Sequence, residues 1–223
     1  MIRRVTSVKQ FGAGLMLAFL LAAGVAAVGG AVDSVPVSGP ATFDGRFVFA
    51  RLRYADGYSG GGFFYRQDLP WAHDYPRAEQ NLMKILDEVT FIDPYLGDDG
   101  GTILTLDDPA LFKYPFAYMS EPGYWTLSED ETVGLRNYLL KGGFLIFDDF
   151  HADDHWYNLE TQMKKVLPDL RWFQLDASHP VYHSFFDIDS LEYDEVYPGD
   201  IPIFFGLFEN NDPQDRLVAV ANH

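Results

Sequence analysis

The stretch Ser128–His151 constrains the fold more than any other, because it joins a helix start, a helix stop, a strand and clustered ionisable groups. Ser128 and Glu131 have the spacing of a capping box, which satisfies backbone donors in the first turn of a helix. Lys141 and Gly142 are the cation and the glycine that commonly end a helix. The stretch therefore predicts a helix that stops at Gly142.

A buried strand is predicted directly after this helix. The run Phe144–Phe147 is short and continuously apolar, which is typical of a parallel strand buried on both faces. Asp148, Asp149 and His151 follow at once. Open α/β sheets bind ligands in the crevice outside the carboxyl ends of their strands. We therefore expect a site at this strand end.

Strands and helices alternate along the rest of the chain. Strands are expected at 47–53, 102–106, 116–119, 172–175, 203–208 and 217–221, and helices near 76–89 and 155–167. Leu82, Ile85, Leu86 and Val89 have helical spacing, so the first helix is expected to lay this face on the sheet. The alternation predicts an α/β architecture with a mostly parallel sheet. The turn-rich gap Asn210–Pro213 predicts an antiparallel hairpin at the C-terminal end.

The N-terminal segment has the pattern of an export signal. A basic start precedes an almost wholly apolar run over 11–28, and small residues up to Ala31 suit cleavage. We interpret 1–31 as a signal peptide, 32–45 as a linker and 46–223 as the α/β domain, which predicts a periplasmic or secreted location. The alternative is an uncleaved membrane anchor, because the run approaches the roughly 18 residues of a span.

The composition narrows the classes of function. The chain has 33 acidic and 16 basic residues, a formal charge of −17 and no cysteine. So acidic a surface repels nucleic acid, and we exclude nucleic-acid recognition. Without cysteine the chain has no thiolate nucleophile. No motif points to a cofactor, and the expected partners are an unknown small molecule or a protein of the cell envelope.

Several stretches together resemble a known bacterial family. They are Asp74–Glu79, Tyr118–Trp125, Gly142–His151, His179-Pro180 with Phe185-Phe186, and Val218–His223. On these motifs the chain, from about Phe47 to its end, resembles the family catalogued as domain of unknown function 4159 (DUF4159). The resemblance implies a class I glutamine amidotransferase-like fold, which is a flavodoxin-like three-layer sandwich. It also implies that members continue beyond His223, so we expect this chain to lack a last strand or helix.

The amidotransferase comparison bears on two positions. The strand-end position of the catalytic cysteine corresponds to Asp148 or Asp149, and His223 resembles the late histidine. A thioester mechanism needs a thiolate and is excluded for this chain. What the resemblance leaves is a carboxylate and imidazole site.

Three interpretations of the strand-end residues stay open. In a catalytic one, Asp149 is a general base or nucleophile, and His151 or His223 is its proton partner. In a metal-binding one, Asp149, His151 and another carboxylate surround a divalent ion, although we assign no metal ligand set. In a structural one, Asp148 or Asp149 caps the following helix and His151 donates to backbone.

Polar and aromatic loop residues are expected to line a ligand pocket over the strand ends. We predict that Asp148, Tyr58, Arg66 and Trp125 contribute to it, because binding residues concentrate on loops that a scaffold positions. The preferred function is an exported, amidotransferase-like domain that binds a small ligand or a protein partner. The alternative is a carboxylate and histidine hydrolase or a metal-dependent one, and a third is an envelope scaffold.

Overall fold

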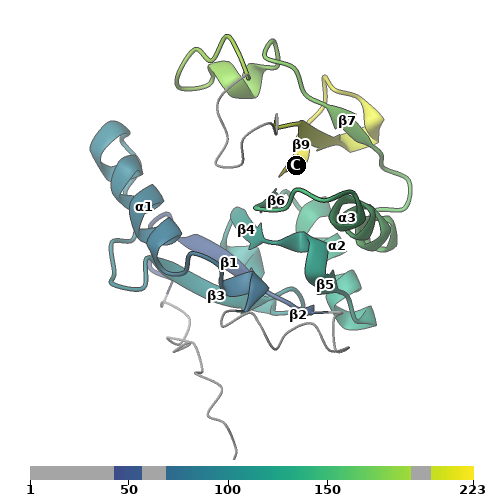
Figure 1. Cartoon of the computed structure of the whole chain (residues 1–223). Coiled ribbons are helices and arrows are strands. Elements are labelled where there is room, and N and C mark those ends of the chain that lie inside the picture. The colour runs from purple at the N-terminus through teal and green to yellow at the C-terminus, as the bar shows by residue number, and fades with distance from the viewer. Residues whose placement is uncertain (1–42, 57–68, 192–201) are drawn as a thin grey trace, which may run out of the picture. The chain divides into compact units, whose positions relative to one another are not determined.

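The largest element of the computed structural model is a seven-stranded sheet in the order β3-β1-β4-β6-β9-β8-β7 (Figure 1). The structure describes residues 43–56, 69–191 and 202–223. The sheet strands are β1 (Phe49–Arg53), β3 (Gly101–Thr105), β4 (Phe116–Ser120), β6 (Phe144–Asp148), β7 (Trp172–Gln174), β8 (Phe204–Phe208) and β9 (Leu217–Asn222). A second, two-stranded sheet pairs β2 (Ala55–Asp56) with β5 (Trp125–Thr126).

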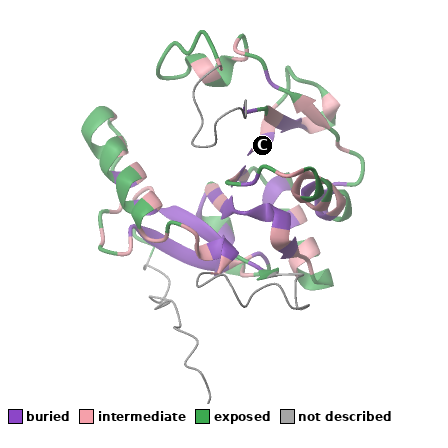
Figure 2. Cartoon of the chain, in the orientation of Figure 1, coloured by how far each residue is buried: buried purple, intermediate pink, exposed green. Residues whose placement is uncertain are grey.

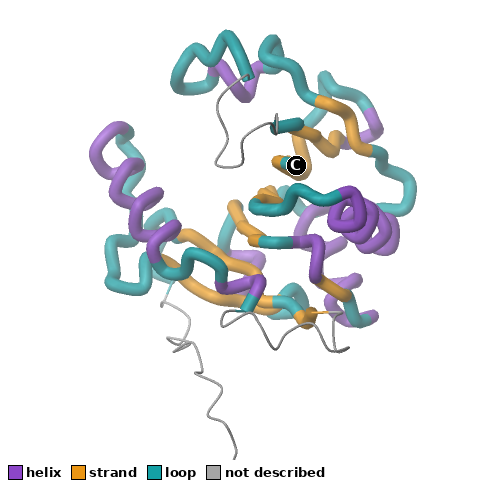
Figure 3. Tube along the Cα trace, viewed as in Figure 1, coloured by secondary structure: helices purple, strands orange, loops and turns teal. Residues whose placement is uncertain are grey.

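The pairing confirms the predicted fold class. Strands β3, β1, β4, β6 and β9 are parallel neighbours, whereas β8 pairs antiparallel with both β9 and β7. Three helices connect them: α1 (Arg77–Val89), α2 (Glu129–Leu140) and α3 (Asp153–Val166). Figures 1 and 3 show α1 on one side of the sheet and α2 and α3 on the other. This is a mostly parallel α/β arrangement of the flavodoxin-like kind with an antiparallel C-terminal pair.

Residues 1–42, which hold the predicted signal peptide and most of the predicted linker, lie outside the described part of the chain. Among the residues that are described, no helix has the length and apolar character needed to cross a membrane.

Both ends of α2 form as predicted. The Ser128 hydroxyl accepts from the Glu131 amide at 3.2 Å, and the Glu131 carboxylate accepts from the Ser128 amide at 2.9 Å, which is the capping box. At the other end Gly142 has φ +107°, and the Gly143 amide donates to the Tyr138 carbonyl at 3.0 Å. This left-handed C-terminal motif turns the chain directly into β6.

The strand registers separate the side chains into two faces. Parallel partners point to the same side, so one face carries Ala50, Leu52, Ala117, Met119, Leu145, Phe147, Ala219 and Ala221, all 0% exposed. We call it the packed face; the buried side chains of α2 and α3 belong to the same apolar core. The opposite face, which we call the polar face, carries Phe49, Arg51, Phe116, Tyr118, Phe144, Ile146 and Asp148.

The prediction that β6 is buried on both faces is wrong. Leu145 and Phe147 are fully buried on the packed face, whereas Phe144, Ile146 and Asp148 are only half-buried. Figure 2 shows buried residues on the sheet strands, whereas α1 is mostly exposed. The continuous apolar run therefore marks a strand with one close-packed face and one partly covered face.

The face that α1 turns to the sheet also differs from the prediction. Its buried residues are Glu79 and Met83, while Ile85 is 54% and Val89 is 46% exposed. The physical reason is the ion pair between Glu79 and Arg51 of β1, whose side chains are 1% and 0% exposed. Because a buried charge needs its partner, this pair sets the rotation of the helix ahead of its apolar stripe.

Candidate functional site

The sheet changes winding direction beside β1. The chain passes from β1 through α1 to β3 on one side, and the later strands β4, β6 and β9 lie on the other side. Such a switch point leaves a crevice at the carboxyl ends of the two diverging strands, where open α/β sheets bind ligands. Here those ends are the ends of β1 and β4, with β6 beside them. The residues that follow these strands are therefore the first to consider.

Three ionisable side chains from separate segments meet at this place. They are His73, which precedes α1, Glu121, which follows β4, and Asp149, which follows β6. His73 Nδ1 contacts the Asp149 carboxylate and lies 3.9 Å from Glu121 Oε1. One ligand atom from each residue lies within 4.8 Å of the others. We call this group the strand-end cluster.

Burial differs among the three members. The Glu121 side chain is 7% exposed, whereas His73 is 34% and Asp149 is 41% exposed. The cluster thus has a buried carboxylate at its base and an imidazole and a carboxylate that reach solvent.

The backbone of the cluster is unusual. Glu121 has φ +47°, Asp149 has φ +64°, and Asp74, next to His73, has φ +60°. Non-glycine residues rarely adopt this left-handed conformation, and where they do, it often marks a functional site. At Glu121 and Asp149 it ends the extended path of β4 and β6 and turns each carboxylate out of the strand direction.

Hydrogen bonds to backbone carbonyls hold two members in place. Arg51 Nη1 donates to the carbonyl oxygens of Trp71 at 2.9 Å and His73 at 3.1 Å. The Tyr54 hydroxyl donates to the carbonyl oxygens of Ser120 at 2.8 Å and Glu121 at 2.7 Å. Since Arg51 and Tyr54 are themselves buried, the turns that carry His73 and Glu121 are fixed from inside the fold.

The charges around His73 change its titration. Burial lowers the pKa of His73, but the Asp149, Asp74 and Glu121 carboxylates outweigh it, so the pKa lies above its ordinary value. An imidazolium is thus favoured among three carboxylates. The cluster as a whole attracts positive charge.

Asp148 has a different environment from Asp149. Its carboxylate accepts from the Tyr118 hydroxyl at 3.1 Å and from Asn222 Nδ2 at 3.3 Å on the polar face. Burial, with the Asp148 carboxylate, raises the pKa of Tyr118 well above its ordinary value, so Tyr118 stays a donor. Asp148 therefore links β4, β6 and β9 beneath the crevice. The following helix, α3, has Ala152 as its N-cap residue and no side-chain cap, so neither Asp148 nor Asp149 caps it.

The other predicted catalytic residues lie outside the strand-end cluster. His151 is exposed, and its ring centroid is 6.3 Å from that of His155. His223 packs its ring against Phe150 at 5.2 Å and Trp156 at 5.5 Å between centroids. Of the predicted catalytic set, the structure brings only Asp149 into the cluster.

The predicted ligand-binding residues have three outcomes. Tyr58 and Arg66 lie outside the described residues. Trp125 has no exposed surface and packs edge-to-face with Phe147 at 5.6 Å between centroids, so it lies in the core. Asp148 lies on the polar face, where it bonds to Tyr118 and Asn222.

Sequence reasoning missed His73 and Glu121. Glu121 carries a signal, because it is the second residue after the predicted strand 116–119, just as Asp149 is the second residue after the predicted strand 144–147, and β4 and β6 pair Ser120 with Asp148. The sequence around His73 offers no such signal, apart from the position of His73 directly before Asp74-Tyr75-Pro76. Its position depends on the long-range tie to Arg51.

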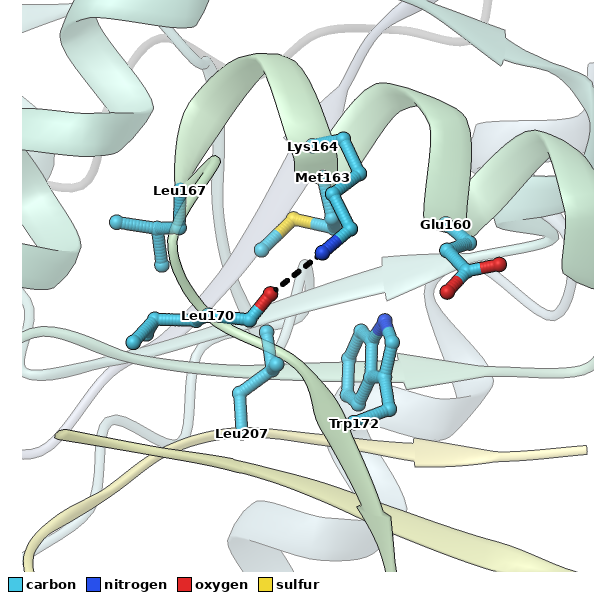
Figure 4. A pocket seen from close by; sticks show the side chains of 7 residues that line it. All are labelled: Glu160, Met163, Lys164, Leu167, Leu170, Trp172 and Leu207. Carbon is cyan, nitrogen blue, oxygen red and sulfur yellow. Dashed lines mark hydrogen bonds between the residues drawn. The ribbon is translucent and has the colours of Figure 1, made fainter. Parts of the chain in front are cut away.

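Among the hollows in the described part of the chain, two are compared with the cluster. One, between α3 and β7, measures about 10 Å³ and is crossed by the bond from Lys164 Nζ to the Leu170 carbonyl at 2.9 Å (Figure 4). It has room for about one water molecule. The other measures about 490 Å³ and is lined by Asp176, His179 and Asp215 among others. Neither includes a member of the strand-end cluster.

The fold and the strand-end crevice define a flavodoxin-like α/β domain with a carboxylate and imidazole site at its switch point. Comparison with known families gives a match to Domain of unknown function (DUF4159) over residues 48–223. The chain belongs to this family. No curated protein matches the chain.

Proposed function

We propose that this chain is an exported α/β domain that binds a positively charged ligand, either a small molecule or a basic group of an envelope protein, in the strand-end crevice. The observation that carries the proposal is the convergence of His73, Glu121 and Asp149 from three separate segments at the switch point. The basic start and apolar run of the first 31 residues support export.

Electrostatics favours a cationic ligand. Around His73, the Asp149, Asp74 and Glu121 carboxylates all favour a positive charge at the ring. The guanidinium of Arg51, which lies below, is already paired with Glu79. With a formal charge of −17 over the whole chain, long-range attraction adds to the local effect. A cation or a basic group is therefore the ligand that this crevice stabilises best.

The chain has no cysteine, so binding without amidotransferase chemistry follows from its residues. A glutaminase assay on the purified chain checks this point, and genuine release of ammonia from glutamine would overturn it.

A thermal-shift experiment tests ligand binding. The full chain is heated in chelator-containing buffer with putrescine, lysine, choline and a basic peptide, beside uncharged sugars. We expect the melting temperature to rise with one or more of the cations in wild type and in His183→Ala, and to stay unchanged in Asp149→Asn, which lacks one of the carboxylates. Shifts of equal size in all three proteins, or no shift with any cation, would contradict the proposal.

A second candidate function is hydrolysis, favoured by one observation. Asp149 contacts Nδ1 of His73, so Nε2 is the ring nitrogen left to exchange a proton with a water molecule or substrate, in the manner of a carboxylate-oriented general base. In that case a compound that shifts the melting temperature is also hydrolysed by the wild-type chain. A folded Asp149→Asn variant should then lose this turnover. Unchanged turnover in Asp149→Asn would remove Asp149 from the reaction.

A further inference from the structure

We propose that the strand-end cluster is a binding site for one divalent transition-metal ion, with His73 Nδ1 and the carboxylates of Glu121 and Asp149 as its protein ligands. This inference rests on the proposed function, since it names the cation that the crevice holds. The three ligand atoms already lie within 4.8 Å of one another. An ion between them requires shifts of these side chains, since zinc binds nitrogen and oxygen at roughly 2.0–2.2 Å.

The donor set selects the class of metal. One imidazole nitrogen with two carboxylates suits zinc, manganese or iron, whereas calcium and magnesium prefer sites made of oxygen alone. Three protein ligands leave at least one coordination position for water or a substrate, which is the pattern of catalytic rather than structural metal sites. Because His73 and Asp149 are 34% and 41% exposed, that position faces solvent.

The support around the ligands distinguishes the site from a chance group of surface acids. Glu121 is 7% exposed, and a carboxylate so deeply buried is stabilised by a cation beside it. Its carbonyl accepts from Tyr54 at 2.7 Å and its amide donates to the Asp148 carbonyl at 2.9 Å. The His73 carbonyl accepts from Arg51 at 3.1 Å. The turns that carry both ligands are held before any ion binds, as preorganised metal sites require.

The chain offers a closely matched control. His183 Nδ1 lies 3.3 Å from the Asp187 carboxylate, and the His183 side chain is 34% exposed, the same as that of His73. This pair has a histidine and an acid but, among the described residues, no group with a third ligand like that of the strand-end cluster, so it tests whether a surface histidine beside an acid suffices.

The experiment is a zinc titration of the chelator-treated, dialysed full chain by calorimetry, followed by the visible absorption spectrum with cobalt(II). We expect one equivalent of zinc to bind wild type and His183→Ala equally. In His73→Ala and Asp149→Asn the affinity should fall by more than about 100-fold, because loss of one direct ligand should exceed the roughly 10–100-fold effects of outer partners. The cobalt spectrum should lose its ligand-field bands. Circular dichroism confirms that each variant is folded.

Asn tolerates the left-handed backbone at position 149, so Asp149→Asn carries the test even if His73→Ala fails to fold. No zinc binding, equal affinity in wild type and Asp149→Asn, or an equal loss in His183→Ala would each overturn the inference. If zinc does not bind but an organic cation still shifts wild type and not Asp149→Asn, the metal site is wrong and the proposed function stands. If neither cation binds, both are wrong.

Discussion

The two faces of the same sheet are built for different tasks. On the packed face, small and large apolar side chains are fully buried against α2 and α3. On the polar face, Arg51 pairs with Glu79, its guanidinium carbon lies 5.0 Å from the Tyr118 ring centroid, and Tyr118 donates to Asp148. The first face supplies stability through burial. The second face carries a network of polar groups that positions the strand-end cluster.

The largest expected effect concerns the packed face. Phe147 is 0% exposed and contacts Trp125 and Trp172 through ring edges. Phe147→Ala should lower the free energy of unfolding by about 3–5 kcal/mol, because it leaves a cavity between the sheet and its helices. Urea unfolding measures it, with Val133→Ala, at a position 51% exposed, as the control that should change little. A loss below 1 kcal/mol would mean that this face is loosely packed.

The next effect tests the polar face. Glu79→Gln leaves the Arg51 guanidinium buried without a charged partner, and should cost about 3 kcal/mol. Replacing both residues by apolar ones, Arg51→Met with Glu79→Leu, should recover most of this loss, since apolar replacement of a buried pair is often neutral. The double variant should nevertheless bind zinc more weakly than wild type, because the His73 carbonyl has lost its donor. Full binding in a stable double variant would show that the pair serves the fold alone.

A smaller effect is expected from the link between Tyr118 and Asp148. Tyr118→Phe removes the hydroxyl that donates to the Asp148 carboxylate at 3.1 Å, and should lower the free energy of unfolding by about 1.5 kcal/mol. Tyr157→Phe, at a position 71% exposed, is the matched control. Equal stability of the two variants would place Asp148 with the solvated residues and not with the polar network.

The smallest effect lies beyond both faces, at the hollow beside η5 (Pro180–His183). Burial lowers the pKa of His179 more than the Asp176 carboxylate raises it. A histidine with a lowered folded pKa is most stabilising above its unfolded pKa of about 6.5 and loses that contribution as the pH falls below it. His179→Asn should flatten the fall in melting temperature between pH 7 and pH 5. An unchanged slope would assign the acid sensitivity to other groups.

The sequence predicted the local features of the site better than it predicted which residues belong to the strand-end cluster. The end of β6, the helix before it and the position of Asp149 follow from capping, glycine and apolar-run signals that lie close together in the chain. The predicted proton partners of Asp149, which are His151 and His223, lie outside the strand-end cluster. Within the cluster Asp149 contacts His73, which is 76 positions away in the chain.

What the sequence by itself determined is the order of elements, the α/β class and the strand end at which ionisable groups gather. Helix caps, helical spacing and turn residues act over a few positions, so their effect can be recognised in the sequence. Only the tertiary structure decided which face of α1 is buried and which residues complete the cluster. The rotation of α1 and the position of His73 both depend on Arg51, whose charge pairs with Glu79 and whose Nη1 donates to the His73 carbonyl. Such long-range pairing follows from the free-energy cost of burying a charge without a partner, and no local sequence pattern indicates it.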